Sequence, residues 1–355
     1  MATIQADNIA DLVAGTLKDL GKPKFQQIAQ EIQDYEVFPR WFKKDKVLLD
    51  SGIGIQRNLM NRTQGNARHV GLYQTDITNV RDAIDQLTVP WRHAETSYAM
   101  DVREVMMNKG DALIFNIIEP RRDGAMIDLV QLLEDYAWSS PGSSSDNLLP
   151  YGLPYWVVKN ATTGFNGGAA SGHTTVAGVS LTDSPTFKNY TALYTNKTKA
   201  DLITKMRTAH RKIRFKSPVA GSDYSKAAAD KYRIYVNETT IAGFEDVGEA
   251  QNENLGRDIA SVWGGDVSKG REGGIMFRGN PLVWVPKLDA DTSDPVYMID
   301  HGCFMPYVMK ENFMRETVIK PSQDQHNVVK IFIDLSYNYV CVNRRGNAVL
   351  ATSAS

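Results

Sequence analysis

The stretch at residues 271–300 constrains the fold of this chain more than any other segment. It contains three short apolar runs separated by polar and turn-forming residues, at 275–277, 282–285 and 296–299. The turn signal Gly279-Asn280-Pro281 separates the first two runs, and Asp300 closes the last. Short apolar runs bounded in this way are typical of buried strands. The stretch therefore predicts buried β-structure, with Trp284 as one of its buried side chains.

The residues before this stretch predict a strand between two helices. Residues 232–237, YRIYVN, alternate apolar and polar side chains, and Asn237 is a favourable N-cap for a helix at 238–250. An earlier helix is predicted at 198–215. Its buried stripe is predicted to consist of Leu202, Met206, Ala209 and Ile213. Its outer face is basic and contains Lys205, Arg207, Arg211, Lys212 and Arg214.

This order of helix, strand, helix, glycine-rich loop, strand and strand resembles that of the tailed-bacteriophage major capsid proteins with the HK97-like fold. The matching segments are residues 199–215, 232–237, 239–256, 278–286 and 296–300. The resemblance implies an α+β fold with an N-terminal arm (N-arm), an extended β-hairpin (E-loop), a spine helix with a peripheral P-domain, and an axial A-domain. It divides the chain into an N-terminal arm (1–50), an E-loop ribbon (51–102), a spine helix in the first part of the P-domain (103–140), an A-domain (141–320) and C-terminal P-domain strands (321–355).

The first hundred residues contain little that forms a core by itself. Residues 1–35 show two short amphipathic helical patterns, which either build a satellite core or pack on a neighbouring subunit. Residues 51–100 are rich in Asn, Gln, Arg and Gly, so too little apolar surface is available to offset the entropy of ordering them. Either another chain stabilises this ribbon, as the resemblance implies, or it is an ordinary surface insertion.

Two helices are predicted in the middle of the chain, at residues 103–119 and 123–138, with an interruption at Pro120. The second is apolar around more than half of its circumference, which indicates a helix covered on several sides, and it matches the spine helix. Arg121 and Arg122 lie at the break and are candidates for ion pairs with another subunit, although exposed pairs contribute little.

The remaining segments predict a second domain and a return to the first. The loop at residues 141–145 is the predicted boundary, and a strand at 153–158 follows it. Residues 160–185 are rich in Gly, Ala, Ser and Thr and predict long ordered loops. Near the C-terminus, residues 328–334 and 337–343 predict two alternating strands joined at Leu335-Ser336. The resemblance assigns this hairpin to the P-domain sheet.

The charge balance argues against a dedicated nucleic-acid binder and permits self-association. Forty Lys and Arg residues are matched by 41 Asp and Glu residues. The basic face of residues 199–216 fits a solvated or salt-bridged helix better than a DNA contact. Cys303 and Cys341 have neither metal-binding spacing nor a His pair nearby, which predicts buried, reduced thiols. No membrane span and no secretory signal are expected.

Motifs that carry chemistry are incomplete in this sequence. Residues 167–174 have the spacing of a phosphate-binding loop, but His173 stands where the lysine is required. Asp289, Asp291 and Asp294 lack the glycine and the distal glutamate of a calcium loop, so a solvated turn is predicted. The histidines, at positions 69, 93, 173, 210, 301 and 326, form no ligand pair, and no catalytic-triad signature occurs. We therefore predict no catalytic residue, no cofactor and no metal site.

The resemblance implies a structural function, that of a major capsid protein that self-assembles into the icosahedral shell around a double-stranded DNA phage genome. Its partners would be copies of itself in hexamers and pentamers, a portal protein, a decoration protein and packaged DNA held by non-specific contacts. A separate scaffolding protein is expected, because Met1 is followed almost at once by arm-like sequence. The protein would assemble in the bacterial host cytoplasm and reside in the virion. The alternatives are a soluble α/β enzyme with a site in the glycine-rich residues 164–178, and another virion structural protein.

Overall fold

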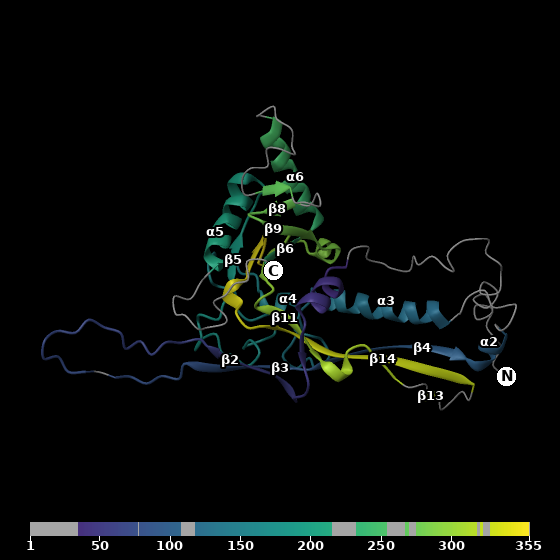
Figure 1. The fold of residues 1–355 in the computed structure, drawn as a ribbon. Coiled ribbons are helices and arrows are strands. Elements are labelled where there is room, and N and C mark those ends of the chain that lie inside the picture. The colour runs from purple at the N-terminus through teal and green to yellow at the C-terminus, as the bar shows by residue number, and fades with distance from the viewer. Residues whose placement is uncertain are drawn as a thin grey trace.

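The computed structural model describes residues 35–76, 78–107, 118–214, 232–253, 267–269, 275–317, 320–321 and 327–354. The amphipathic patterns of residues 1–34 and part of the helix predicted at 103–119 lie outside these ranges, as does His326. Figure 1 shows an elongated molecule. A long hairpin projects from one side of the body, and helix α3 (Ile118–Ala137) extends to the other side beside strands β4 (Arg92–Asp101) and β14 (Val328–Cys341).

The long strand β14 organises a six-stranded sheet. It pairs antiparallel with β4 over ten residues, from Val328↔Asp101 to Tyr337↔Arg92. Its other neighbours are β11 (Phe304–Met309), β12 (Arg315–Glu316) and β13 (Lys320–Pro321), and β1 (Val47–Leu49) pairs with β11.

The two strands predicted at 328–334 and 337–343 are therefore one, and the predicted turn at Leu335-Ser336 is wrong. Both residues stay in register with β4, opposite Ala94 and His93. The buried Ser336 hydroxyl lies 2.7 Å from Nδ1 of His93, so a polar residue is accommodated inside the sheet.

The second sheet has seven strands in the order β5-β15-β10-β6-β9-β8-β7. The strands are β5 (Tyr190–Leu193), β6 (Tyr232–Val236), β7 (Val267–Lys269), β8 (Ile275–Phe277), β9 (Asn280–Trp284), β10 (Val296–Asp300) and β15 (Ala348–Ala351). The strands predicted within residues 271–300 are thus present, and β10 is buried along its whole length. Sheet membership does not follow the predicted boundary at 320–321, because β11 belongs to the six-stranded sheet and β15 to the seven-stranded one.

Trp284 does not occupy the buried position that the sequence predicts. Its side chain is 36% exposed. It ends β9, where β6 pairs with it on one side, whereas β8 pairs only with Asn280 and Pro281. Its indole N–H donates to the carboxylate of Asp289 at 3.0 Å, so the ring lies at the surface with its polar edge satisfied.

Two helices cover one face of the seven-stranded sheet. The π-helix η3 (Lys199–Ile203) continues into α5 (Thr204–Ile213), and the predicted stripe of Leu202, Met206, Ala209 and Ile213 is buried, as expected. Helix α6 (Glu238–Glu253) begins after Asn237, whose side-chain oxygen accepts the Thr240 N–H at 3.1 Å and so confirms the predicted cap.

One predicted helix boundary and one predicted strand are wrong. Helix α3 begins at Ile118 and runs through Pro120, because the N–H groups of a first turn have no intrahelical acceptor and proline loses nothing there. The strand predicted at 153–158 is instead the short helix α4 (Leu153–Trp156), with Pro154 near its start, where the fixed backbone angle suits a helix. The short helix α2 (Val102–Met107) follows β4.

The other face of the seven-stranded sheet meets the six-stranded sheet in an aromatic core. Trp41, in the π-helix η1 (Val37–Asp45), is fully buried at its centre. Five rings lie with their centroids 5.2 to 5.8 Å from the Trp41 ring, those of Trp138, Tyr235, His301, Phe304 and Tyr339. This core also receives the carboxylate of Glu134 in α3, which accepts the backbone N–H of Val37 at 2.8 Å. Residues 37–45 are therefore an integral part of the body, although the sequence places them in the arm.

Candidate functional site

The projecting hairpin has a firmly paired base. Strand β2 (Gly54–Met60) pairs antiparallel with β3 (Ile84–Pro90), from Gly54↔Pro90 to Met60↔Ile84, and the Asn61 N–H continues the ladder to the Ala83 carbonyl at 3.1 Å. Side chains on its inner face are buried in the main core, namely Ile55, Leu59, Leu87 and Val89. The hairpin occupies only the first part of the predicted ribbon (51–102), because the strand that follows is β4 of the body sheet.

Asp85 fixes the direction in which the hairpin leaves the body. Its carboxylate accepts hydrogen bonds from the Ser184 hydroxyl, from the Asn61 amide at 3.2 Å and from Arg62 at 3.0 Å. These bonds, that of Ser184 first, hold the pKa of Asp85 below its usual range. On β2, the Arg57 guanidinium donates to the Tyr307 hydroxyl of β11 at 2.8 Å. The base of the hairpin is thus tied to the body by charged and hydroxyl groups.

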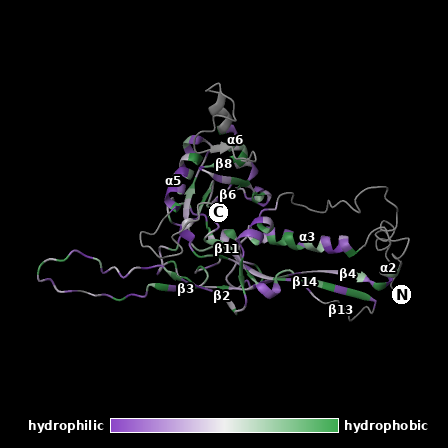
Figure 2. Ribbon diagram, in the orientation of Figure 1, coloured by the Kyte–Doolittle hydropathy of each residue, from purple (hydrophilic) through white to green (hydrophobic). Residues whose placement is uncertain are grey.

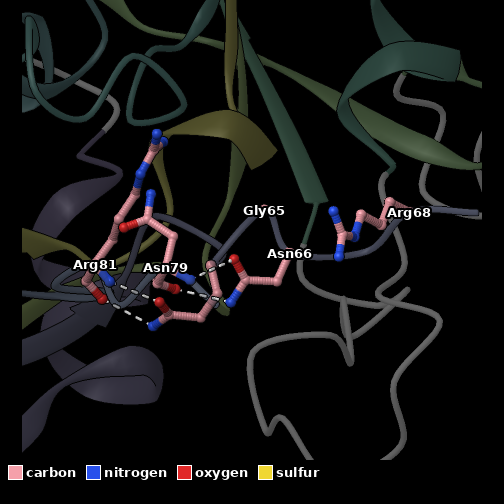
Figure 3. A pocket seen from close by; sticks show the side chains of 6 residues that line it. Gly65, Asn66, Arg68, Asn79 and Arg81 are labelled. Atoms are coloured by element: carbon pink, nitrogen blue, oxygen red, sulfur yellow. Dashed lines mark hydrogen bonds between the residues drawn. The ribbon is translucent and has the colours of Figure 1, made fainter. Parts of the chain in front are cut away.

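Beyond the base, side-chain amides join the two arms of the hairpin. The Gln64 amide donates to the Arg81 carbonyl at 2.8 Å and accepts the Arg81 N–H at 2.7 Å. Asn66 makes the same two bonds with Asn79, at 2.8 and 3.1 Å. Figure 3 shows the Asn66 side chain reaching across to Asn79 on the other arm. Sequence reasoning missed this ladder, although its signal is amide residues two positions apart, which lie on one face of an extended chain.

A hollow of about 300 Å³ lies along this ladder. Its lining is polar and consists of Gln64, Gly65, Asn66, Arg68, Asn79 and Arg81 (Figure 3). Towards the tip, Arg68 donates to the Thr75 carbonyl at 2.7 Å. Hydrogen bonds between the two arms therefore hold the loop in shape, and its described residues, 63–76 and 78–82, are all exposed.

Large apolar side chains of the hairpin point into solvent. The exposed ones are Ile53, Met60, Val70, Leu72, Tyr73, Val80 and Ile84. Leu72 is 93% exposed, and Tyr73, at the tip, is fully exposed with a φ of 61°. Figure 2 shows hydrophobic segments scattered between hydrophilic ones along the projecting loop. An apolar group that stays in water forfeits roughly 1.5 to 3 kcal/mol relative to a buried one, so this surface fits a contact with another molecule.

The glycine-rich segment 164–178 is packed against the body. Arg344, fully buried, donates to the Gly168 carbonyl at 2.7 Å and to the Asn189 side chain at 3.1 Å. A Cβ on Gly167 would collide with the Asn189 side chain, 1.8 Å away. His173 lies edge-on to the Tyr155 ring and reaches the Pro141 carbonyl at 3.2 Å. No helix follows residue 174 within this described loop, so the geometry of a phosphate-binding loop is not formed.

The aspartates of residues 289–294 lie at a partly exposed turn, as predicted, and two of them are also tied to neighbouring segments. Asp291 pairs with Lys159 at 2.6 Å, and Asp294 pairs with Lys197 at 2.8 Å. Burial opposes ionisation of Asp291, but the bonds from Lys159 and Ser293 outweigh it and hold its pKa below the usual value. These carboxylates join the loop to its neighbours.

The other candidate residues lie apart from one another. Arg121 pairs with Glu104 at 2.7 Å and Arg122 with Glu316 at 2.6 Å, so the ion pairs that the sequence suggested with another subunit form within this chain instead. Cys303 and Cys341 are buried free thiols, as the sequence predicts, and burial raises the pKa of Cys341 to about 12. Within the described ranges, no group of three or more His, Cys, Asp or Glu residues is placed to hold a metal ion, and no helix there is long and apolar enough to cross a bilayer.

The fold of the chain is similar to that of solved phage capsid structures. A chain of the cyanophage A-1(L) capsid asymmetric unit superposes with a TM-score of 0.59 at 15% identity, over 88% of this chain and 91% of that chain. A chain from the capsid of the native GTA particle gives a TM-score of 0.53 at 10% identity, over 94% and 96% of the two chains. No family model matches the sequence, and the search of curated proteins gave no match. At these identities the similarity is one of fold, and the protein has the α+β, HK97-like fold of phage capsid proteins.

Proposed function

We propose that this chain is a major capsid protein, many copies of which self-assemble into an icosahedral shell around a double-stranded DNA phage genome. The projecting hairpin is the observation that carries the proposal. Its base is fixed by Asp85 and by buried side chains of β2 and β3, whereas its tip presents Leu72 and Tyr73 to solvent. A hairpin with a firmly held base and an apolar tip suits a contact that extends over a neighbouring copy.

The energetics favour repeated contacts over a single strong one. Burying Val70, Leu72 and Tyr73 on a neighbour contributes on the order of 5 kcal/mol. Association of two proteins costs an estimated 4 to 15 kcal/mol in lost freedom, so one such contact does not hold two subunits together. A closed, symmetric shell lets each copy both give and receive this contact, and the many weak interfaces then act together.

The remaining partners of the proposal follow from the same function. They are hexamers and pentamers of the chain, a separate scaffolding protein, a portal protein, a decoration protein and packaged DNA, with assembly in the host cytoplasm. The enzyme alternative gains no support from residues 164–178, all of which the structure describes, because Asn189 and Arg344 fill the space beside the glycines. The scaffold is tested by expressing the chain alone, which we expect to give irregular shells; uniform shells would contradict this expectation.

A shortened hairpin tests the proposal. Replacing residues 64–80 with Asn-Gly keeps the register of β2 and β3, since the new turn closes between Thr63 and Arg81. We expect soluble, folded subunits that form no closed shells of any size by negative-stain microscopy. The double variant Leu72→Ser/Tyr73→Ser in the full-length loop is expected to weaken assembly, whereas His69→Ser, also exposed, serves as its matched control. Normal shells from the shortened variant would refute the role of the hairpin, and a small native oligomer with enzymatic turnover would refute the capsid function.

A further inference from the structure

The two helices on the outer face of the seven-stranded sheet carry opposite charge. Residues 199–214 contain six cationic side chains, Lys199, Lys205, Arg207, Arg211, Lys212 and Arg214, and one acidic residue, Asp201. Helix α6 has three acidic residues among those whose side chains the structure describes, 238–247, namely Glu238, Glu245 and Asp246, and neither Lys nor Arg among them. The formal charges of these two segments are therefore +5 (6 − 1) and −3 (0 − 3), within a chain whose net charge is only −1.

Both helices lie on the same face of the sheet, near opposite ends. Residues of α5 and Phe244 of α6 share one hydrophobic core with Val296 and Met298 of β10, whereas Tyr297 and Ile299 of that strand face the other core. Helix α5 packs on β5 and β15, and α6 packs on β9. Figure 1 shows the two helices on either side of this part of the molecule.

The sheet keeps the two charged helices apart within one chain. Strands β10 and β6 lie between β15 and β9, which places the strands under the helices about 14 Å apart at a strand spacing of about 4.8 Å. Helices in direct contact lie 8 to 10 Å apart, and charges in solvent are screened beyond about 8 Å at physiological salt. Most of the attraction between the two groups is therefore available to another molecule.

Exposed members of each group are placed for such a contact. Arg211 and Lys212 are exposed in the last turn of α5, and Glu245 and Asp246 are exposed on α6. Lys205 pairs with Asp201 at 2.5 Å and Arg214 donates to Asn280 at 3.2 Å, whereas Arg211 donates to the uncharged Arg207 carbonyl of its own helix, at 3.3 Å. The pairs 211–212 and 245–246 thus define a basic and an acidic patch on one domain.

We propose that the basic patch of α5 in one copy of this chain docks against the acidic patch of α6 in the next copy, so that the seven-stranded-sheet domains join head to tail in a ring. The inference rests on the proposed function, because it concerns how copies are arranged within a shell. Two different patches at opposite ends of one domain form a heterologous contact, which closes into a ring when the rotation between copies allows it. DNA phosphates are the other possible ligand of the basic patch, but they leave the acidic patch of α6 without a role.

The contribution of these patches is to orientation and specificity more than to affinity. Exposed ion pairs are individually weak, yet complementary fields steer encounter, and juxtaposed like charges exclude wrong arrangements. The apolar hairpin tip has no such directional preference. The charged helices therefore supply the direction in which copies follow one another around the ring.

Charge reversal in the full-length chain tests this inference. The basic-patch variant Arg211→Glu/Lys212→Glu and the acidic-patch variant Glu245→Lys/Asp246→Lys each place like charges against each other. We expect each to raise the critical concentration for association about tenfold in low salt, equivalent to about 1.4 kcal/mol per contact, and by less in high salt. Light scattering and analytical ultracentrifugation measure association, and circular dichroism confirms folding.

Two matched controls restore complementary charge. The variant with all four substitutions is expected to associate at close to the native concentration. A 1:1 mixture of the two pair variants is expected to do the same in rings with an even number of copies, where the two variants alternate. This inference would be overturned if the pair variants associated like the native chain, or if the fourfold variant were as defective as either pair variant. The proposed function would still stand in that case, provided that the native chain forms shells. Loss of duplex DNA binding by the basic-patch variant, with normal association, would assign the patch to DNA instead. A native chain that stays monomeric would overturn both proposals.

Discussion

Replacing Arg344 with Met is expected to loosen the glycine-rich segment from the body. Arg344 lies between β14 and β15 in the sequence, and its fully buried side chain reaches three segments of the chain. It donates to four oxygen atoms, the carbonyls of Trp156 at 2.6 Å, Phe187 at 3.1 Å and Gly168 at 2.7 Å, and Asn189 Oδ1 at 3.1 Å. One side chain thus satisfies hydrogen-bond acceptors in helix α4, in the glycine-rich segment and in the turn that leads into β5.

The magnitude follows from two opposing effects. Three buried carbonyls left without this donor cost about 1 to 3 kcal/mol each, or about 6 kcal/mol together. Burial also opposes the charge itself and lowers the pKa of Arg344 to about 10 from 12.5, a shift that corresponds to about 3 kcal/mol. Removing the charge recovers this amount. The net loss is therefore about 3 kcal/mol, out of a typical stability of 5 to 15 kcal/mol.

Urea denaturation of isolated subunits, followed by tryptophan fluorescence, measures this loss, and limited proteolysis within residues 164–189 reports whether it is local. The matched control is Arg345→Met, at the next position. The Arg345 guanidinium lies over the Phe165 ring, 4.4 Å from its centroid, and is only partly buried, so we expect its loss to cost less than about 1 kcal/mol. A native-like stability and proteolytic pattern for Arg344→Met would refute the assignment of this residue as the anchor.

Two further predictions concern buried and exposed side chains of the body. Burial raises the pKa of Glu36 to about 7 despite Arg40 and Arg233 nearby, so the native state binds this proton more tightly than the unfolded chain does. The free energy of unfolding is therefore expected to fall by about 3 kcal/mol between pH 4.5 and pH 7. In urea denaturation, Glu36→Gln should reduce that fall, and a pH profile of stability unchanged from the native one would contradict the prediction. Trp284→Ala should lower the free energy of unfolding by about 1 kcal/mol, because the Trp284 ring is partly exposed. Trp156 is fully buried, so Trp156→Ala should lower it by about 3 to 5 kcal/mol. Equal melting temperatures of the two variants would show that burial does not set the difference.

Local patterns predicted the elements whose determinants are local. The strand at 232–236 alternates with period two, and Asn237 caps the next helix through its own side chain, so neither depends on distant residues. Leu335-Ser336 misled the same reasoning, because its polar residue is accommodated by His93, which lies 243 positions away in the sequence. Helix α4 also escaped prediction, since four residues are too few to show a helical period.

The candidate site was predictable in its composition but not in its geometry. Residues 51–100 contain few apolar side chains, which suggested a segment stabilised by another chain. Within this range, β2 and β3 form a projecting hairpin. The ladder that Gln64 and Asn66 build depends on which positions face each other across the hairpin, and that register is set by pairing at its base. The opposite charges of α5 and α6 are visible in the sequence, but their position on one common face depends on the order of the strands beneath them.

The hairpin and the two charged helices divide the requirements of assembly between them. Apolar contacts supply most of the free energy of association but specify direction poorly, because burial is favourable in many orientations. Charged patches specify direction and contribute little free energy when they remain wet. A subunit with a near-neutral net charge avoids strong self-repulsion, and the separation of positive and negative charge on one domain still gives each contact a direction. In this proposal the hairpin extends the contact to a neighbouring copy, and the charged helices set the direction in which copies follow one another. Identical copies need both properties to close a shell.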